Sequence, residues 1–353
     1  MLHIPVMNGN MLLEPCISIN HRNDYSNYNS LFPSIIDVFR RFPSNTAMIR
    51  SIVTVAILFA LLAACAKPDG AMKAYLEGDY ATALREFRPR AEQGDARAQY
   101  ILGVMYTEGE GVPRDYQRAA SWFEKSATLG DPEAQFNLGT AYDTGRGVPK
   151  DLDRAAHWYR KAAAQKQARA QHNLGYMYTN GQGVEKNLTQ AVKWYRQAAE
   201  QGYAAAQTSL GVMYQKGWGV PRDHEAAMDW YRKAADQKDA TAQSNLGFMY
   251  HEGQGADRDF ELAAKWFNRA AEQGDSTAQF YLGLMYIKGE GVEKDSVEAH
   301  KWAIIALSSA PRGRIRDNAA RARDLFQQTM TIGQIARARR MAKTWMEKYG
   351  GAK

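Results

Sequence analysis

The stretch that decides the fold is DARAQYILGVMYTEGEGVPRDYQRAASWFEKSATLG, residues 95–130 of 353. The chain repeats this pattern five more times at a constant interval of 36 residues, and no insertion interrupts the series. Its Leu-Gly pairs stand at Leu102-Gly103, Leu138-Gly139, Leu174-Gly175, Leu210-Gly211, Leu246-Gly247 and Leu282-Gly283. A constant period of roughly 20 to 50 residues is typical of a solenoid, in which neighbouring repeats bury each other's apolar faces.

Each repeat contains two amphipathic segments. In the first, Ala98, Leu102 and Tyr106 recur at the spacing of one helix face, and residues 119–127 show the same spacing after a glycine-rich break. We therefore expect an all-α fold built from pairs of antiparallel helices. Gly103 lies inside the first helix, where glycine costs about 1 kcal/mol relative to Ala. Its recurrence in every repeat predicts that a Cβ there would push two helices apart.

The break Gly109-Glu110-Gly111-Val112 predicts the end of the first helix, because glycine after a helix end readily adopts the left-handed conformation. Val112 is expected to be a buried plug. A short polar residue then precedes each second helix, as expected of an N-cap. These residues are Asp115, Asp151, Asn187, Asp223, Asp259 and Asp295.

A consensus summarises these residues: A-Q-x-x-L-G-x-M-Y-x-x-G-x-G-V-x-x-D, followed by A-x-x-W-Y-x-K-A-A-x-Q-G. It resembles the Sel-one-like repeat, a relative of the tetratricopeptide repeat with a longer loop. The resemblance covers residues 95–310 and implies a right-handed α-solenoid of about six repeats, with capping helices at both ends. It also implies a non-enzymatic adaptor or scaffold that binds other proteins or peptides, with no cofactor and no small-molecule substrate.

The segment before the repeats has the order of a secretory signal. Arg50 is followed by the apolar run SIVTVAILFALLAA and then by Cys65. The sequence Leu62-Ala63-Ala64-Cys65 resembles the lipobox of bacterial lipoproteins, which implies that Cys65 carries the lipid anchor. We therefore expect a bacterial cell-envelope protein, anchored by lipid on the outer membrane and facing the periplasm; a short transmembrane signal-anchor is the alternative.

The sequence divides into six expected segments. They are an extension at 1–47 that is disordered or untranslated, a lipoprotein-type signal at 48–64, an anchor and linker at 65–70, a degenerate capping repeat at 71–94, six Sel-one-like repeats at 95–310, and basic capping helices at 311–353. In the last segment, residues 317–330 and 332–349 look like two helices. Ile332, Ile335, Ala338, Ala342 and Trp345 are expected to cover the open end of the stack, with Arg337, Arg339, Arg340 and Lys343 on or near the opposite side.

Charge is unevenly distributed along the chain. Residues 311–353 hold 11 Lys and Arg against 3 Asp and Glu, whereas residues 66–310 hold 30 against 32. Export would remove nucleic acid as a partner of the basic end and would favour an acidic lipid or glycan surface. The two cysteines, Cys16 and Cys65, leave no disulfide framework or Cys-based zinc site inside the repeats.

Positions that vary between repeats are the candidates for partner binding. In the related tetratricopeptide fold the first helix of each repeat lines the concave groove, and the exposed positions flank the Leu-Gly pair. Carried over, the groove would present Tyr100, Phe136, His172, Thr208, Ser244 and Phe280, then Asn137, Asn173 and Asn245, then Thr140, Tyr176 and Phe248. Asn can hold a bound backbone through its donor and its acceptor, and aromatic rings offer rigid apolar contact. The alternative is that Asn at this position only braces neighbouring helices.

Two other functions remain open from the sequence. One is a hydrolase acting on cell-wall or β-lactam substrates, although no nucleophile and base stand at a defensible spacing and no S-x-x-K motif occurs. The other is an intracellular adaptor, which requires that residues 48–65 are not a signal. Scattered histidines at different repeat positions predict no metal site.

Overall fold

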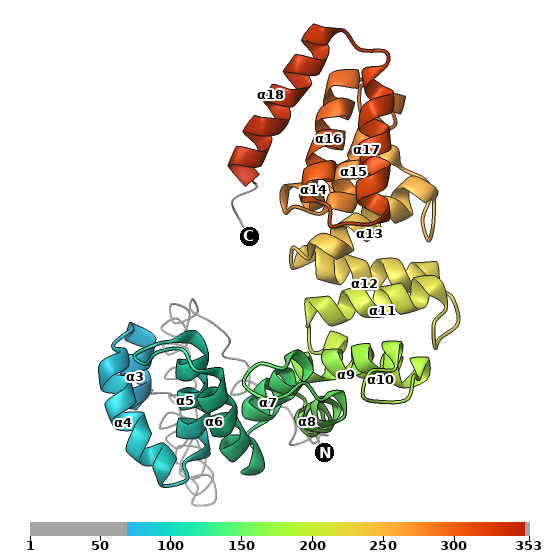
Figure 1. The fold of residues 1–353 in the computed structure, drawn as a ribbon. Coiled ribbons are helices and arrows are strands. Elements are labelled where there is room, and N and C mark those ends of the chain that lie inside the picture. Colours follow the sequence, from blue (N-terminus) through green and yellow to red (C-terminus); the bar gives the residue numbers. More distant parts are fainter. Residues whose placement is uncertain (1–68, 350–353) are drawn as a thin grey trace, which may run out of the picture. The chain divides into compact units, whose positions relative to one another are not determined.

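The structure is a computed structural model that describes residues 69–349. The expectations for residues 1–68, including the signal segment and Cys65, lie outside the described residues. Every regular element within the described range is an α-helix, and the helices keep the labels of Figure 1. The all-α prediction is therefore confirmed.

The described helices form successive pairs (Figure 1). A leading pair, α3 (Gly70–Glu77) and α4 (Tyr80–Glu92), precedes six repeats. The repeats are α5 (Ala96–Glu108) with α6 (Tyr116–Thr128), α7 (Pro132–Thr144) with α8 (Leu152–Ala164), α9 (Ala168–Asn180) with α10 (Leu188–Glu200), α11 (Ala204–Lys216) with α12 (His224–Asp236), α13 (Ala240–Glu252) with α14 (Phe260–Glu272), and α15 (Ser276–Lys288) with α16 (Ser296–Ser309). Each second helix also packs on the first helix of the next repeat, which is the connectivity of a solenoid.

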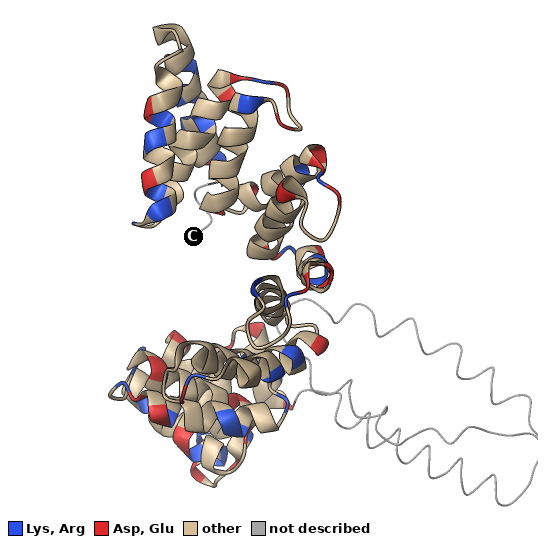
Figure 2. Ribbon diagram, turned by 90° about the vertical axis from the view of Figure 1, so that its right-hand side faces the viewer, with Lys and Arg blue, Asp and Glu red and all other residues tan. Residues whose placement is uncertain are grey.

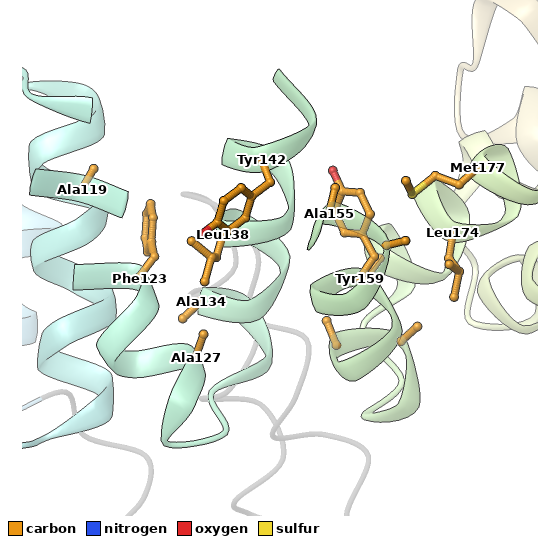
Figure 3. Close-up of a cluster of buried hydrophobic side chains, with 14 of the residues drawn as sticks. Ala119, Phe123, Ala127, Ala134, Leu138, Tyr142, Ala155, Tyr159, Leu174 and Met177 are labelled. Atoms are coloured by element: carbon orange, nitrogen blue, oxygen red, sulfur yellow. The ribbon is translucent and has the colours of Figure 1, made fainter. Parts of the chain in front are cut away.

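The apolar core continues from one repeat into the next. One buried cluster contains Phe123 of α6, Leu138 of α7 and Tyr159 of α8, so three consecutive helices share it (Figure 3). Leu174 of α9 extends the same cluster into the third repeat. No repeat buries its apolar face alone, which explains why the pattern must recur to be stable.

The glycine of each Leu-Gly pair is required by an aromatic ring. A Cβ on Gly103 would lie 2.5 Å from the Phe123 ring, and a Cβ on Gly211 would lie 2.6 Å from the Tyr231 ring. The predicted clash is thus confirmed in the first five repeats, with a side chain rather than a helix backbone as the obstacle. In the sixth repeat Ala303 replaces the ring, and the nearest atom to a Cβ on Gly283 is the Ala299 oxygen at 3.2 Å.

The loop between the two helices has the predicted turn geometry. Gly109 ends α5 in the left-handed conformation, with φ of 78°, and Asp115 accepts hydrogen bonds from two backbone N–H groups at the start of α6. All six predicted N-cap residues cap their helices by accepting from at least one such N–H group. The second loop glycine contacts the preceding repeat, because a Cβ on Gly183 would lie 2.1 Å from the Leu152 oxygen. Val112 is half-buried rather than fully buried.

The glutamine of each Ala-Gln pair is buried and links neighbouring repeats. The Gln171 Nε2 donates to the Ala163 oxygen at the end of α8, and the Gln171 Oε1 accepts from Gln201 at the end of α10, at 3.1 and 2.6 Å. We call this arrangement the glutamine relay. In the first repeat Leu129 stands where Gln201 stands, and the Gln99 Oε1 has no hydrogen-bond partner within residues 69–349.

The C-terminal end of the described range consists of α17 (Arg314–Gln327) and α18 (Ile332–Tyr349), which pack against α16. Ala338 and Ala342 are buried, as expected, and the Trp345 ring lies 5.5 Å from that of Trp302. The expectation for Ile332 is wrong, because its side chain is 88% exposed at the first position of α18. Arg337, Arg339, Arg340 and Lys343 are exposed, as expected.

Candidate functional site

The candidate binding positions lie on the first helices α5, α7, α9, α11, α13 and α15. We call them the first-helix face, defined as the two residues before each Leu-Gly pair and the one residue after it. Consecutive first helices contact one another through this face. The His172 Nε2 lies 3.1 Å from the Ser209 oxygen of the next repeat, and the Phe248 and Tyr281 rings lie 5.8 Å apart. The positions that the sequence singled out therefore connect from repeat to repeat.

The aromatic residues two positions before Leu-Gly are anchored on the core. Tyr100 and Phe136 lie 6.1 and 5.8 Å from the buried rings of Phe123 and Tyr159 in the same repeats. Burial raises the pKa of the Tyr100 hydroxyl. Both rings remain half-buried, so one side of each ring is used in packing. Phe280 is also half-buried and packs at the C-terminal end.

Thr208 and Ser244 occupy the same position in the next two repeats but are buried. The Thr208 hydroxyl donates to Asp239 at 3.0 Å, which is the residue that caps α13. Ser244 interacts with Asp275, the cap of α15, whose pKa is raised by burial. Small hydroxyl side chains at this position therefore join one repeat to the cap of the next and present little surface to a partner.

The asparagines directly before Leu-Gly are partly engaged inside the protein. The Asn137 Nδ2 donates to the Glu133 oxygen of its own helix at 3.0 Å. Asn173 interacts with the Tyr159 hydroxyl of the preceding repeat, and burial raises the pKa of that hydroxyl to about 12. Asn245 is half-buried. These contacts favour bracing as one role of Asn173, while Asn137 binds only its own helix.

Tyr176 is the most exposed aromatic residue among the candidates. It stands directly after Leu174-Gly175, and its side chain is 52% exposed. The equivalent residues Thr140 and Phe248 are half-buried. Thr140 is occupied within the protein, since its hydroxyl donates to the Phe136 oxygen at 3.0 Å and accepts from Tyr159 at 3.2 Å. Tyr176 thus marks the part of the face with the most free ring surface.

A charged cluster borders the N-terminal part of this face. Arg169 forms an ion pair with Glu133 of the preceding repeat, and its guanidinium lies 4.4 Å from the centre of the Phe136 ring. Arg97 stacks in the same way on Tyr100, at 5.1 Å. Sequence reasoning missed this cluster, although the alternation of Arg97, Glu133 and Arg169 at a spacing of 36 residues carries the signal. Figure 2 shows acidic and basic residues interspersed along the repeats.

The His172–Ser209 contact has the residue types of a base and a nucleophile, but its hydrogen bond runs in the wrong direction for that chemistry. The Ser209 hydroxyl already donates to the Ala205 oxygen at 2.9 Å. The imidazole must therefore donate to the serine oxygen and does not accept its proton. Burial lowers the pKa of His172, and the ring is held between Tyr195 and Tyr203, both at 5.5 Å. The pair is a packing contact between repeats.

A hollow of about 690 Å³ opens at the loop of the fifth repeat. Ala256 lines it and stands where the other five repeats have valine. Phe260 and Glu261 lie at its rim, and Gly291 of the next repeat closes one side. The hollow is open to solvent, and Ala256 fills less of it than a valine would.

Within residues 69–349, no three His, Cys, Asp or Glu side chains gather in a way that could hold a metal ion. None of the helices in this same part of the chain is long and apolar enough to cross a membrane.

Comparison with known proteins relates the repeats to one family. The family model described as the Sel1 repeat matches residues 96–131, 132–166, 168–203, 204–239, 240–275 and 276–309. These six matches together span more than half of the chain. None of the curated proteins matches the sequence.

Solved structures give the same relation. The chain is similar to a Sel1 repeat protein from Oxalobacter formigenes, with 33% identity and a TM-score of 0.64 over 69% of this chain and 97% of that one. A protective antigen of uropathogenic Escherichia coli displaying an SLR fold, c5321, shows 26% identity and a TM-score of 0.34 over 79% and 91% of the two chains. The immunity protein Pa5087 from Pseudomonas aeruginosa shows 22% identity and a TM-score of 0.39 over 66% and 83%.

The six matched repeats and the similarity to the Oxalobacter protein agree with the helix pairs, loop glycines and N-caps described above. The chain therefore belongs to the Sel1 repeat family.

Proposed function

We propose that this protein is a non-enzymatic scaffold that binds an extended segment of a partner protein on its first-helix face. The observation that carries the proposal is the exposure of Tyr176, 52%, at a position whose residue differs from repeat to repeat. Residues that recur in every repeat are used in packing or capping. Residues that vary are free to differ, so they are the ones that can be selected for a partner.

The geometry of the face suits a polypeptide. The Phe136 ring packs on the buried ring of Tyr159, so it loses little conformational freedom on binding. Asn137 and Asn245 can offer an amide donor and acceptor to a peptide backbone. The Glu133–Arg169 pair at the border would add charge selectivity, which affects specificity more than affinity.

The cellular setting belongs to the same proposal. We place the scaffold on the bacterial cell envelope, tethered by a lipid on Cys65 and facing the periplasm from the outer membrane. The support is the lipobox-like sequence Leu62-Ala63-Ala64-Cys65 after an apolar run. Metabolic labelling with a fatty acid tests this part, because the label is expected on the protein and should disappear in Cys65→Ser. Labelling that persists in that variant would contradict it.

The binding test compares two exposed aromatic residues. Tyr176 lies on the first-helix face, whereas Trp218, 44% exposed, lies in the loop of the fourth repeat. Affinity capture from envelope extracts is expected to recover a partner with the unchanged protein and with Trp218→Ser. Capture should fall at least about 10-fold with Tyr176→Ser, because interface aromatic residues commonly contribute more than 1 kcal/mol.

Asn173→Ala is a less informative change, since it also removes the contact with Tyr159. Circular dichroism of Tyr176→Ser should match that of the unchanged protein, because the substituted side chain is half exposed. Equal capture by both variants would rule out the first-helix face as the binding surface. Loss of capture with Trp218→Ser alone would move the site to the loops.

A further inference from the structure

The helices α17 and α18, which we call the terminal pair, concentrate the basic charge of the chain. Residues 311–349 contain 10 Lys and Arg against 3 Asp and Glu. Residues 66–310, which include all six repeats, contain 30 against 32. The proposed scaffold function does not account for this asymmetry, because it places partner binding on the first helices of the repeats.

The terminal pair is fixed by its inner side, which leaves its outer side available. Ala319 and Phe326 of α17 are buried, as are Ala338 and Ala342 of α18. The Arg316 guanidinium donates to the Leu307 and Ala310 oxygens at the end of α16 and so belongs to the packed side. These residues hold the two helices in place, so the residues on the exposed side are not needed for packing.

One exposed stripe on each helix carries the same pattern. On α17, Arg314, Arg321 and Leu325 follow each other at intervals of seven and four residues, which places them on one stripe. On α18, Ile332, Arg339 and Lys343 follow at the same two intervals. Each stripe thus has one large aliphatic residue and two basic residues.

The two aliphatic residues are exposed and flank the same short turn. Leu325 is 61% exposed near the end of α17, and Ile332 is 88% exposed at the start of α18. Residues 328–331 separate the two helices. At a rise of about 1.5 Å per residue, the basic residues of the stripes lie roughly 6 to 17 Å behind these tips along the helices. Large exposed aliphatic side chains beside basic residues are the features of a helix that binds at a membrane surface.

Among the described ion pairs, acidic residues of the terminal pair engage one of the four basic residues of the stripes, Lys343. Asp324 forms an ion pair with Arg323, and Glu347 lies 3.8 Å from Lys343. Within the described residues, no ion pair involves Arg321, Arg339 or Arg340. Their positive charge is therefore available to phosphate groups.

We propose that the terminal pair docks on an anionic lipid bilayer, with Leu325 and Ile332 entering the interface and the basic residues of both stripes binding lipid phosphates. Phosphates of nucleic acid share the charge but give no role to two exposed aliphatic residues at the leading turn. A bilayer uses both features, since apolar tips penetrate roughly 5 to 10 Å and each nearby Lys or Arg adds attraction to anionic headgroups.

A probe placed at the turn tests the proposal on the full chain. Ile332→Cys, in a background of Cys16→Ser and Cys65→Ser, is labelled with a fluorophore that brightens in an apolar environment. Addition of vesicles containing phosphatidylglycerol is expected to brighten the label several-fold. Vesicles of phosphatidylcholine alone should not, and high salt should reverse the effect because it screens the attraction. A label on Lys216→Cys, at the exposed end of α11 in the fourth repeat, should not respond.

Matched charge variants complete the experiment. The test variant changes three basic residues to Gln: Arg339, Arg340 and Lys343. In this variant the lipid concentration that gives half of the brightening should rise roughly 10- to 100-fold. The same loss of three charges at Lys150, Lys186 and Arg222, which are exposed in the repeat loops, should leave the response unchanged. No brightening at residue 332, equal brightening at residue 216, or a response to duplex DNA without a response to vesicles would each overturn the proposal.

Discussion

The fourth and sixth repeats share one sequence pattern but differ where their two helices meet. In the fourth, Gly211 lies under the ring of Tyr231, and a Cβ would approach it to 2.6 Å. In the sixth, Gly283 faces Ala303, and a Cβ would find its nearest atom at 3.2 Å. Both repeats keep the glycine although only the fourth has the ring. In the fourth repeat the glycine is therefore required by the ring of Tyr231, whereas in the sixth the remaining restriction is the closer approach of a backbone oxygen of α16.

A second difference concerns the residue three positions before that partner. It is Met228 in the fourth repeat and His300 in the sixth, and both are fully buried. The His300 ring lies next to the backbone of Arg323 in α17. The sixth repeat is followed by the terminal pair instead of another repeat, so its second helix meets different neighbours. The position in the array thus decides which departures from the pattern are tolerated.

The largest expected effect comes from adding one methyl group at the two glycines. Gly211→Ala should lower the free energy of unfolding by about 2 kcal/mol, because the overpacking cost exceeds the gain in helix propensity. Gly283→Ala should change it by less than about 1 kcal/mol, because the gain in helix propensity opposes the tight contact with the Ala299 oxygen at 3.2 Å. Urea denaturation followed by circular dichroism measures both, and similar losses in the two variants would contradict the ring explanation.

A double-mutant cycle sharpens this comparison. Tyr231→Ala gives the fourth repeat the arrangement of the sixth, so adding Gly211→Ala in that background should no longer destabilise the protein. The coupling between the two positions should exceed about 1 kcal/mol. If the effects of the two substitutions on the free energy of unfolding are additive, the ring of Tyr231 is not the reason for a glycine at position 211.

The next effect concerns the glutamine relay, which is complete in the second repeat and interrupted in the first. Gln165→Leu should lower the free energy of unfolding by about 1 kcal/mol, because it leaves the Gln135 Oε1 without its partner. Leu129→Gln should raise it by a similar amount by supplying a donor to Gln99. The two variants exchange the same two residue types in opposite directions. If the free energy of unfolding from urea denaturation changes with the same sign in both, the relay does not stabilise the protein.

The smallest expected effect is the pH dependence of the sixth repeat. Burial, followed by the nearby charges of Arg339 and Arg323, lowers the pKa of His300, and Asp324 opposes this. Below pH 6.5 the unfolded chain binds a proton that the folded chain does not, so stability falls as the pH decreases towards the lowered pKa. His300→Leu should show a smaller difference between unfolding midpoints at pH 8 and pH 5 than the unchanged protein. An identical difference would exclude His300 as the cause.

Much of the fold could be predicted because the same pattern occurs six times, so a feature expected in one repeat can be compared with the other five. Asp115 and its five equivalents were predicted as N-caps from their position after the glycine break, and all six are confirmed. The ring over Gly103 was not foreseen as the obstacle, because spacing alone does not show which side chain of the second helix crosses the first. Ile332 was misplaced because helix α18 begins at it, and the first residue of a helix has no preceding turn to pack on.

The candidate site was predictable in position but not in exposure. The sequence placed Thr208 and Tyr176 on the same face, yet one is buried and the other is 52% exposed. The difference depends on the neighbouring repeat, since Thr208 reaches the cap residue Asp239 of the next first helix. The spacing of residues within one repeat predicts which way a side chain points. How much of that side chain is exposed depends on its length and on whether it reaches the next repeat. Whether Tyr176 binds a partner stays a prediction.

The second loop glycine has a consequence for how such a chain can change in length. A Cβ on Gly147, Gly183 or Gly291 would lie within 2.1 Å of a backbone oxygen at the start of the preceding second helix. This contact depends on backbone atoms and so takes the same form wherever two repeats meet. Removing or duplicating 36 residues joins repeats whose meeting surfaces already match at this point. The number of repeats can therefore vary while each junction stays the same, so the length of the first-helix face can change independently of the residues that it presents.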